Sequence, residues 1–400
     1  MQSIEGVKAE FAKTFSGRGG GGGASGGEGR VRVIRAPGRV NLIGEHTDYN
    51  EGMVFPMAIE PEVRIACRAR GDGIVRLASS AFPGEIVEFS VERKIERGEP
   101  AWANYFKGVA AELEQAGIPL TGMDALIENT LPVGGGLSSS AAIEVGTGLA
   151  FLTLSGVDMD RDRLALICQK AEHEYALVPC GIMDQMIVAT GKAGHATQYD
   201  CRSGAKQFVK LDPNDLRVVI VNSMVRHELT GGEYAERRQQ CEAGVAYFRQ
   251  RYPEAGIRAL RDVTMKQIHE AEGKLDGVIL RRCRHVVSES HRTIEAATAL
   301  AQGKYERAGQ LMVESHLSLR DDYEVSCAEL DFLAGQAMTV RGVYGARMTG
   351  GGFGGCIVAL AQPRAVEPLK AHLGKTYRER FGIEAVGFAT VATGGASVVE

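Results

Sequence analysis

Apolar residues recur along the chain at two spacings, which predict a mixture of helices and strands. Apolar positions three to four residues apart predict a short leading helix over 4–15 and further helices over 102–113, 161–178, 233–251, 260–272, 277–301 and 304–318. Alternating or continuous apolar runs predict strands over 54–69, 123–131 and 216–222. The pattern restarts at about Leu211, and 400 residues suffice for two or three domains. We therefore expect one domain over 1–205 and another over 206–400.

The segment 17–29 interrupts this pattern, because it consists almost entirely of glycine with a few small or charged residues. Such a composition cannot supply a hydrophobic core, so a flexible surface loop is expected. We assign it no function and expect its deletion to leave catalysis unchanged.

A glycine-rich stretch at 132–143 carries the clearest chemical signal. Gly134, Gly135 and Gly136 allow a backbone to approach a bulky anion. Ser138, Ser139 and Ser140 follow, and serine is a favoured N-cap for the helix that comes next. A loop entering a helix N-terminus suits a phosphate group, and a serine hydroxyl there suits the Mg²⁺ that accompanies a nucleotide. An ordinary tight connection before a capped helix is the alternative. The spacing matches neither a Walker A loop nor a dinucleotide-binding fingerprint.

Polar side chains are unusually dense just after the first predicted strand. Arg39, Asn41, Glu45, His46 and Asp48 lie within ten positions. A solvated loop would explain them, but so would a site for a polyhydroxylated substrate, since each sugar hydroxyl needs both a donor and an acceptor.

Other candidates each allow a structural and a chemical interpretation. Asp184 opens a predicted helix, where an acid is favoured by the helix dipole or could act as a catalytic base. Glu172 and its two polar neighbours point in different directions on a helix, so only one of them could face a metal. Trp102, the single tryptophan, either packs in the core or stacks on a base. A second glycine-rich turn at 345–355 predicts a cleft lined by backbone between two domains.

Composition narrows the class of protein. A formal net charge of −4 and a pI near 6.2 argue against a nucleic-acid partner. The longest apolar runs fall short of a membrane span, and residues 1–16 lack the apolar region of a signal peptide. The eight cysteines are dispersed, as expected for reduced thiols in the cytoplasm.

Together these stretches resemble a known family. Residues 35–52, RAPGRVNLIGEHTDYNEG, resemble the galactokinase signature almost letter for letter. Residues 132–142 and 348–356 resemble two motifs of the wider superfamily of galactokinases, homoserine kinases, mevalonate kinases and phosphomevalonate kinases. Three more stretches, 179–185, 233–241 and 284–293, resemble galactokinases specifically.

The resemblance implies an α+β fold of two domains with the active site between them, and ATP-dependent phosphorylation of α-D-galactose at its C1 hydroxyl. Asp184 would be the base or charge partner of that hydroxyl, with Arg39 beside it. The sugar would be bound by Glu45, His46, Asp48, Gly181, Asp184 and Tyr234. The nucleotide would be bound by Trp102, Gly134, Gly135, Gly136, Leu137, Ser138, Ser139 and Ser140. Ser140 and Glu172 would hold Mg²⁺.

Two alternatives remain at this stage. One is a related sugar-1-kinase acting on N-acetylgalactosamine or arabinose, and the other is a non-catalytic galactose sensor on the same fold. The intact Ser140-Ala141 pair, with Asp184 and Arg39, favours an enzyme. We expect galactose and ATP as partners, no nucleic acid or membrane, and a monomer or a weak homodimer.

Overall fold

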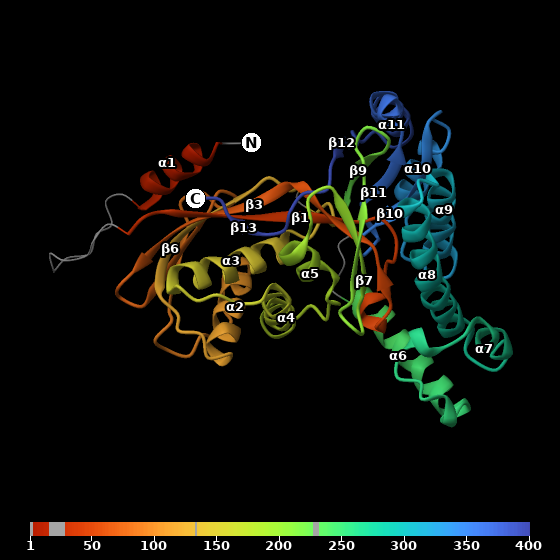
Figure 1. Cartoon of the computed structure of the whole chain (residues 1–400), viewed down its shortest axis with the longest axis horizontal. Helices are drawn as coiled ribbons and strands as arrows, with labels where there is room; N and C mark the ends of the chain where they lie inside the picture. Colours follow the sequence, from red (N-terminus) through yellow and green to blue (C-terminus); the bar gives the residue numbers. More distant parts are fainter. Residues whose placement is uncertain (1–2, 16–28, 133, 227–231) are drawn as a thin grey trace.

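The computed structural model describes residues 3–15, 29–132, 134–226 and 232–400, so Val133 and most of the predicted glycine loop, residues 17–28, lie outside the described residues. Two lobes of mixed helices and strands lie side by side, as Figure 1 shows. The predicted two-domain α+β class is confirmed.

A six-stranded sheet of order β13-β1-β3-β6-β4-β5 forms the first lobe. Its strands are β1 Arg32–Asn41, β3 Pro56–Arg70, β4 Ile74–Ser79, β5 Ile86–Ser90, β6 Gly122–Asn129 and β13 Ser397–Val398. The leading helix α1, Ile4–Phe15, matches its predicted range and buries Val7, Phe11 and Phe15 against one face of the sheet. That apolar stripe attaches a short helix that would be marginal alone.

The other face of this sheet is covered by helices that lead to the site (Figure 1). They are α2 Asn104–Gln115, α3 Ser139–Ser155, α4 Arg161–Ala171 and α5 Met183–Thr190, with short helices η1 Asp48–Asn50 and η2 Ala101–Ala103. The predicted helix over 161–178 changes to a π-helix, η3, at Glu172–Ala176. This change matters because a π-turn re-aims side chains at functional sites.

A four-stranded sheet of order β10-β11-β9-β12 forms the second lobe. Its strands are β9 Arg217–Arg226, β10 Val343–Thr349, β11 Gly354–Ala361 and β12 Val386–Thr390. Its helices are α6 Glu233–Arg251, α7 Met265–Glu270, α8 Gly277–Ala301, α9 Tyr305–Asp321, α10 Ala328–Ala337 and α11 Val366–Phe381, with η4 Pro253–Ala255, η5 Leu260–Asp262 and η6 Pro363–Ala365. The predicted single helix over 260–272 is wrong, because Thr264 caps a new helix there and accepts from the Gln267 N–H.

A small sheet and the last strand join sequence-distant parts of the chain. Strands β2 Met53–Val54, β7 His195–Asp200 and β8 Lys206–Lys210 form a three-stranded sheet. Strand β13 pairs with β1, with Val398 opposite Ile34, so the C-terminal residues join the first sheet. The division at residue 205 stays a prediction. None of the described helices has the length and apolar character required to cross a bilayer.

Candidate active site

A cleft with about 620 Å³ of open space lies where the two lobes meet. It is lined by Arg39, Glu45, His46, Asp48, Glu172, Val178, Cys180, Gly181, Met183, Asp184, Tyr234, Gly350 and Gly351. All the residues predicted for catalysis and sugar binding are in that lining, although they come from three separate parts of the chain, at 39–48, 181–184 and 234. The fold therefore brings together residues that lie up to about two hundred positions apart in the sequence.

Arg39 and Asp184 form a two-pronged ion pair in the cleft. Arg39 Nε and Nη2 each lie 2.7 Å from one Asp184 oxygen. Nη1 of Arg39 donates to the Gly136 carbonyl at 2.5 Å, which ties the pair to the glycine-rich loop. Burial lowers the pKa of Arg39, but Asp184 outweighs this and the net pKa is raised. A bidentate, charge-assisted pair holds both side chains in one orientation.

The glycine-rich loop enters helix α3, as predicted, but the predicted serine cap does not form. Ser138 occupies the N-cap position, and within the described part of the chain its side chain makes no capping hydrogen bond. Its φ of 59° and ψ of 52° are left-handed, whereas a capping hydroxyl reaches the backbone N–H groups of the first turn from an extended residue. The Ser138 hydroxyl donates to Asp184 Oδ2.

Two glycine-rich segments pack backbone to backbone at one end of the cleft. A Cβ on Gly350 would lie 3.0 Å from the Gly136 carbonyl oxygen, and one on Gly355 would lie 3.3 Å from that of Gly135. Gly136 and Gly350 also have positive φ, at 66° and 85°. The close approach and the positive φ values favour glycine at these positions. Gly350 and Gly351 line the cleft but the loop 134–136 is not in its lining, so a cleft lined by both glycine-rich segments stays a prediction.

His46 is held as a neutral ring by its surroundings. Burial lowers its pKa to about 3, so it carries no charge at neutral pH. Its Nε2 faces the Gly351 carbonyl at 3.3 Å and its Nδ1 faces the Tyr49 hydroxyl at 2.8 Å. Because a carbonyl only accepts, Nε2 bears the hydrogen and Nδ1 accepts from Tyr49. The Tyr234 ring lies 5.6 Å from the His46 ring.

Asp48 packs against the backbone of Gly181. A Cβ at Gly181 would come within 1.8 Å of Asp48 Oδ2, so no other residue fits there without movement. Burial raises the pKa of the Asp48 carboxyl to about 6, and the Asp184 charge contributes in the same direction. The cleft thus holds two carboxylates with different partners: Asp184 is paired with Arg39, whereas Asp48 packs against the Gly181 backbone.

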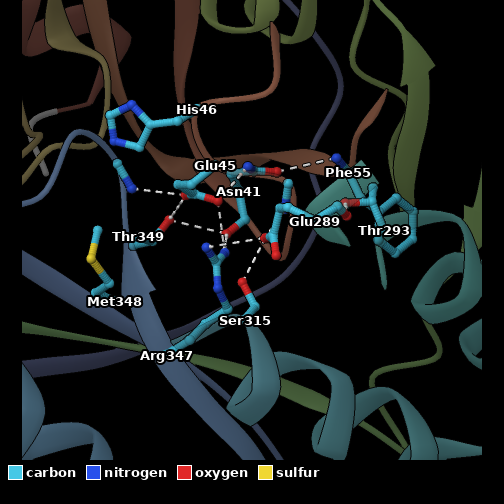
Figure 2. Close-up of polar contacts among 12 residues, drawn as sticks. Asn41, Glu45, His46, Phe55, Glu289, Thr293, Ser315, Arg347, Met348 and Thr349 are labelled. Atoms are coloured by element: carbon cyan, nitrogen blue, oxygen red, sulfur yellow. Dashed lines mark hydrogen bonds and ion pairs between the residues drawn. The ribbon is translucent and has the colours of Figure 1, made fainter. Parts of the chain in front are cut away.

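Glu45 is nearly fully buried and accepts four hydrogen bonds, as Figure 2 shows. Oε1 accepts from the Thr349 hydroxyl at 3.0 Å and from the Gly350 N–H at 2.9 Å. Oε2 accepts from Asn41 Nδ2 at 2.6 Å and pairs with Arg347 at 2.7 Å. Burial raises the pKa of Glu45, and the Arg347 charge opposes that rise.

Sequence reasoning assigned no role to Arg347 or Glu289, which lie beneath Glu45. Both are 0% exposed. One signal was available, because Arg347 stands between Ala346 and Met348 in a segment otherwise apolar or rich in glycine. A charge inside a buried strand requires a partner.

Glu172 lies in a buried acidic cluster at the side of Asp184. Gln185 Nε2 donates to both Glu172 and Glu144, and the Ser140 hydroxyl bonds to Glu172. Burial raises the pKa of both glutamates, with further contributions from Asp184 at Glu172 and from Glu172 at Glu144. One Glu144 oxygen is buried without a hydrogen-bond partner among the described residues.

This donor set fits Mg²⁺. A hydroxyl and a carboxylate in contact supply the hard oxygen ligands that Mg²⁺ takes, and nucleotide phosphates and waters normally complete its shell. The described residues include no group of three or more His, Cys, Asp or Glu side chains arranged for a metal. A site shared with a bound nucleotide needs no such group.

Trp102 lies outside the described lining of the cleft. Its ring stacks on Phe82 with centroids 5.7 Å apart and planes 11° apart, and Nε1 donates to Glu85 at 3.3 Å. Its predicted place near adenine stays a prediction. Leu137 is buried, and its carbonyl accepts from the Arg39 N–H, whereas Ser139 begins α3.

The arrangement provides a carboxylate fixed by an arginine, a backbone loop for an anion, and polar groups for a small polyol. Solved structures show the same fold: Methanococcus jannaschii mevalonate kinase, 18% identical, covers 91% of this chain and 99% of its own with a TM-score of 0.64. The models of the GHMP kinase N-terminal and C-terminal domains match residues 104–192 and 296–379. Fold and site together define a GHMP kinase.

Closer relatives narrow the class further. The galactokinase galactose-binding signature matches residues 24–69. Galactokinases of Chloroflexus aggregans and Homo sapiens are 47% and 45% identical, each over 92% of this chain and over 94% and 92% of their own. Lactococcus lactis galactokinase, solved with galactose, is 33% identical with a TM-score of 0.92, covering 98% and 99% of the two chains. The chain belongs to the galactokinase family, and galactokinase is the enzymatic function that these matches show.

Proposed function

We propose that this protein transfers the γ-phosphoryl group of ATP to the C1 hydroxyl of α-D-galactose, giving galactose 1-phosphate and ADP. The observation that carries the proposal is the Arg39–Asp184 pair, which lies between the sugar-signature loop and the glycine-rich loop. A single carboxylate can therefore reach a sugar hydroxyl on one side while its arginine reaches a phosphate on the other.

Asp184 has the central role in this proposal. Its carboxylate accepts a hydrogen bond from the C1 hydroxyl and orients O1 toward phosphorus. The O1–P bond forms as the bond from phosphorus to the ADP oxygen breaks, and the hydroxyl proton passes to Asp184. Arg39 and Ser138 already donate to this carboxylate and so fix its orientation toward the hydroxyl. A loose phosphoryl-transfer transition state depends more on such positioning than on early removal of the proton.

The remaining residues bind and orient the two substrates. Glu45, His46, Asp48, Gly181 and Tyr234 line the sugar side of the cleft. We assign the nucleotide phosphates to the loop of Gly134, Gly135, Gly136, Leu137, Ser138, Ser139 and Ser140, and adenine to the side of Trp102. Arg39 stabilises the charge that develops on the phosphoryl oxygens.

Ser140 and Glu172 would hold Mg²⁺, which neutralises phosphate charge when bound with ATP. The hydrogen bond between these two side chains supports the assignment. We further propose that the enzyme acts in the cytoplasm as a monomer or weak homodimer, without nucleic acid or membrane. Sedimentation velocity over a range of protein concentrations tests the oligomeric state.

An ADP-release assay with MgATP and a panel of galactose, glucose, N-acetylgalactosamine, arabinose and mevalonate tests the reaction. Turnover with galactose far above the other compounds is expected. Higher turnover with N-acetylgalactosamine or arabinose would identify a related sugar-1-kinase. Galactose binding without turnover of any compound would identify a sensor.

A further inference from the structure

Arg347 is a buried cation between two buried carboxylates, and it lines neither the cleft nor the surface (Figure 2). Its Nη1 lies 2.7 Å from Glu45 Oε2, and its Nη2 lies 3.9 Å from Glu289 Oε1. Glu45 belongs to the loop after β1, Glu289 to helix α8 and Arg347 to strand β10. One guanidinium therefore connects the sugar-side loop to the second lobe.

Glu289 holds the backbone of the same loop. Its Oε1 accepts from the Gly44 N–H at 2.9 Å and from Ser315, while Oε2 accepts from Arg292 Nε at 2.8 Å. Burial raises the pKa of Glu289, but Arg292, His285 and Arg347 together outweigh it and lower the pKa to about 2. Both carboxylates on either side of Arg347 thus need its charge.

One of the four donors around Glu45, the Thr349 hydroxyl, has a second acceptor within reach. A carboxylate offers about four acceptor positions, and the four donors occupy all of them. The Thr349 hydroxyl has a single hydrogen but two acceptors at 3.0 Å, Glu45 Oε1 and the Asn41 carbonyl. When that hydrogen turns to Asn41, one position on Oε1 becomes free for a sugar hydroxyl, while Arg347, Asn41 and Gly350 still hold the carboxylate.

We propose that Arg347 is a positioning residue for sugar recognition: it holds the Glu45 carboxylate oriented at the cleft wall without touching the sugar itself. The inference rests on the proposed role of Glu45 as a galactose ligand. It adds a residue from the second lobe to a binding site whose contacts otherwise come mainly from the first.

The test is a mutant cycle on the full chain, built from Glu45→Gln, Arg347→Lys and the double variant. Galactose Kd is measured by isothermal titration calorimetry without nucleotide, and KM for galactose and for ATP is measured by ADP release. Loss of a charge-assisted hydrogen bond predicts a rise of about 10- to 100-fold in galactose Kd for either single variant. The ATP KM should change by less than about threefold, since Arg347 reaches no residue of the nucleotide loop.

The galactose Kd of the double variant shows whether Arg347 acts through Glu45. If Arg347 acts through Glu45, the double variant should bind galactose about as well as Glu45→Gln alone, because the same interaction is lost only once. Additive losses would overturn the inference, as would an Arg347→Lys variant with unchanged galactose Kd. An unchanged Kd in Glu45→Gln would instead overturn the proposed sugar-binding role of Glu45, so the two failures are distinguishable.

A matched control separates positioning from general stability. Arg76 is also a buried arginine paired with a buried carboxylate, with its Nε 2.6 Å from Asp124 Oδ1, but it lies in β4 away from the cleft. Arg76→Lys should lower the melting temperature and leave galactose Kd unchanged. If Arg347→Lys fails to fold, Glu45→Gln with Arg347→Met removes the charged pair together. Its Kd should then match that of Glu45→Gln, and a further tenfold loss would contradict the proposal.

Discussion

The nucleotide-side loop and the sugar-side wall meet at Arg39 but are built in different ways. Gly134 and Gly136 of the loop are exposed, and the loop contacts its surroundings mainly through backbone. On the sugar side, Glu45 and His46 are 2% and 5% exposed. The Glu45 carboxylate has partners from both lobes, with Asn41 and Arg347 on Oε2 and two second-lobe donors on Oε1.

The difference fits the ligand that we propose for each region. A phosphate needs several N–H donors and close approach, which a glycine-rich backbone entering a helix provides locally. A sugar needs carboxylate and imidazole groups in one orientation, and a buried charge stays in place only if it is paired. Local sequence therefore builds the first region, while tertiary contacts build the second.

The largest effect is expected at the point where the two regions meet. Asp184→Asn should lower kcat by about a thousandfold or more, because the residue loses both its proton-accepting charge and its pairing with Arg39. Galactose Kd should change by less than about tenfold. ADP release and calorimetry measure the two quantities. Wild-type turnover would remove Asp184 from the mechanism.

Gly181→Ala should damage the sugar side alone. The new methyl group would overlap Asp48 Oδ2, which lies 1.8 Å from the position of that Cβ, and displace the carboxylate. We expect galactose KM to rise about 100-fold with ATP KM nearly unchanged. Gly335→Ala, at a glycine without a left-handed φ whose Cβ would have open space around it, is a control for folding effects. Equal losses for both substrates would contradict a sugar-side role.

Lowering the pH should weaken galactose binding, because Asp48 becomes protonated. Since burial raises the pKa of Asp48 to about 6, its ionised fraction falls as pH decreases, and galactose KM should rise about tenfold between pH 7 and pH 5. His46 stays neutral over that range because its pKa is about 3. Initial rates across the range test this. Asp48→Asn should remove the inflection, and a wild-type KM independent of pH would exclude Asp48 as its source.

Gly136→Ala should weaken ATP binding, and this effect should be smaller than those of the variants above. The Cβ would meet only the Thr349 carbonyl oxygen at 3.8 Å, so the cost comes from a φ of 66° that alanine adopts reluctantly. We expect ATP KM to rise about three- to tenfold, in line with roughly 1 kcal/mol of backbone strain, and galactose KM to remain unchanged. A rise in galactose KM instead would show that the two regions are coupled.

Local sequence was sufficient for many elements and for the family. Helices α1, α6 and α8 have their predicted bounds, since their apolar spacing and terminal residues act within a few turns. The motifs around Arg39, Asp184 and the glycine loop identified the family, and all the predicted catalytic and sugar-side residues line the cleft.

Tertiary structure alone decided how the charged groups are held. Ser138 binds Asp184 instead of capping α3, the helix after Ala171 becomes a π-turn at Glu172, and Arg347 and Glu289 support Glu45 from the other lobe. These outcomes depend on partners tens to hundreds of residues away. Propensity and spacing describe what a residue does with its neighbours in sequence, whereas a buried charge is controlled by whichever opposite charge the fold brings to it.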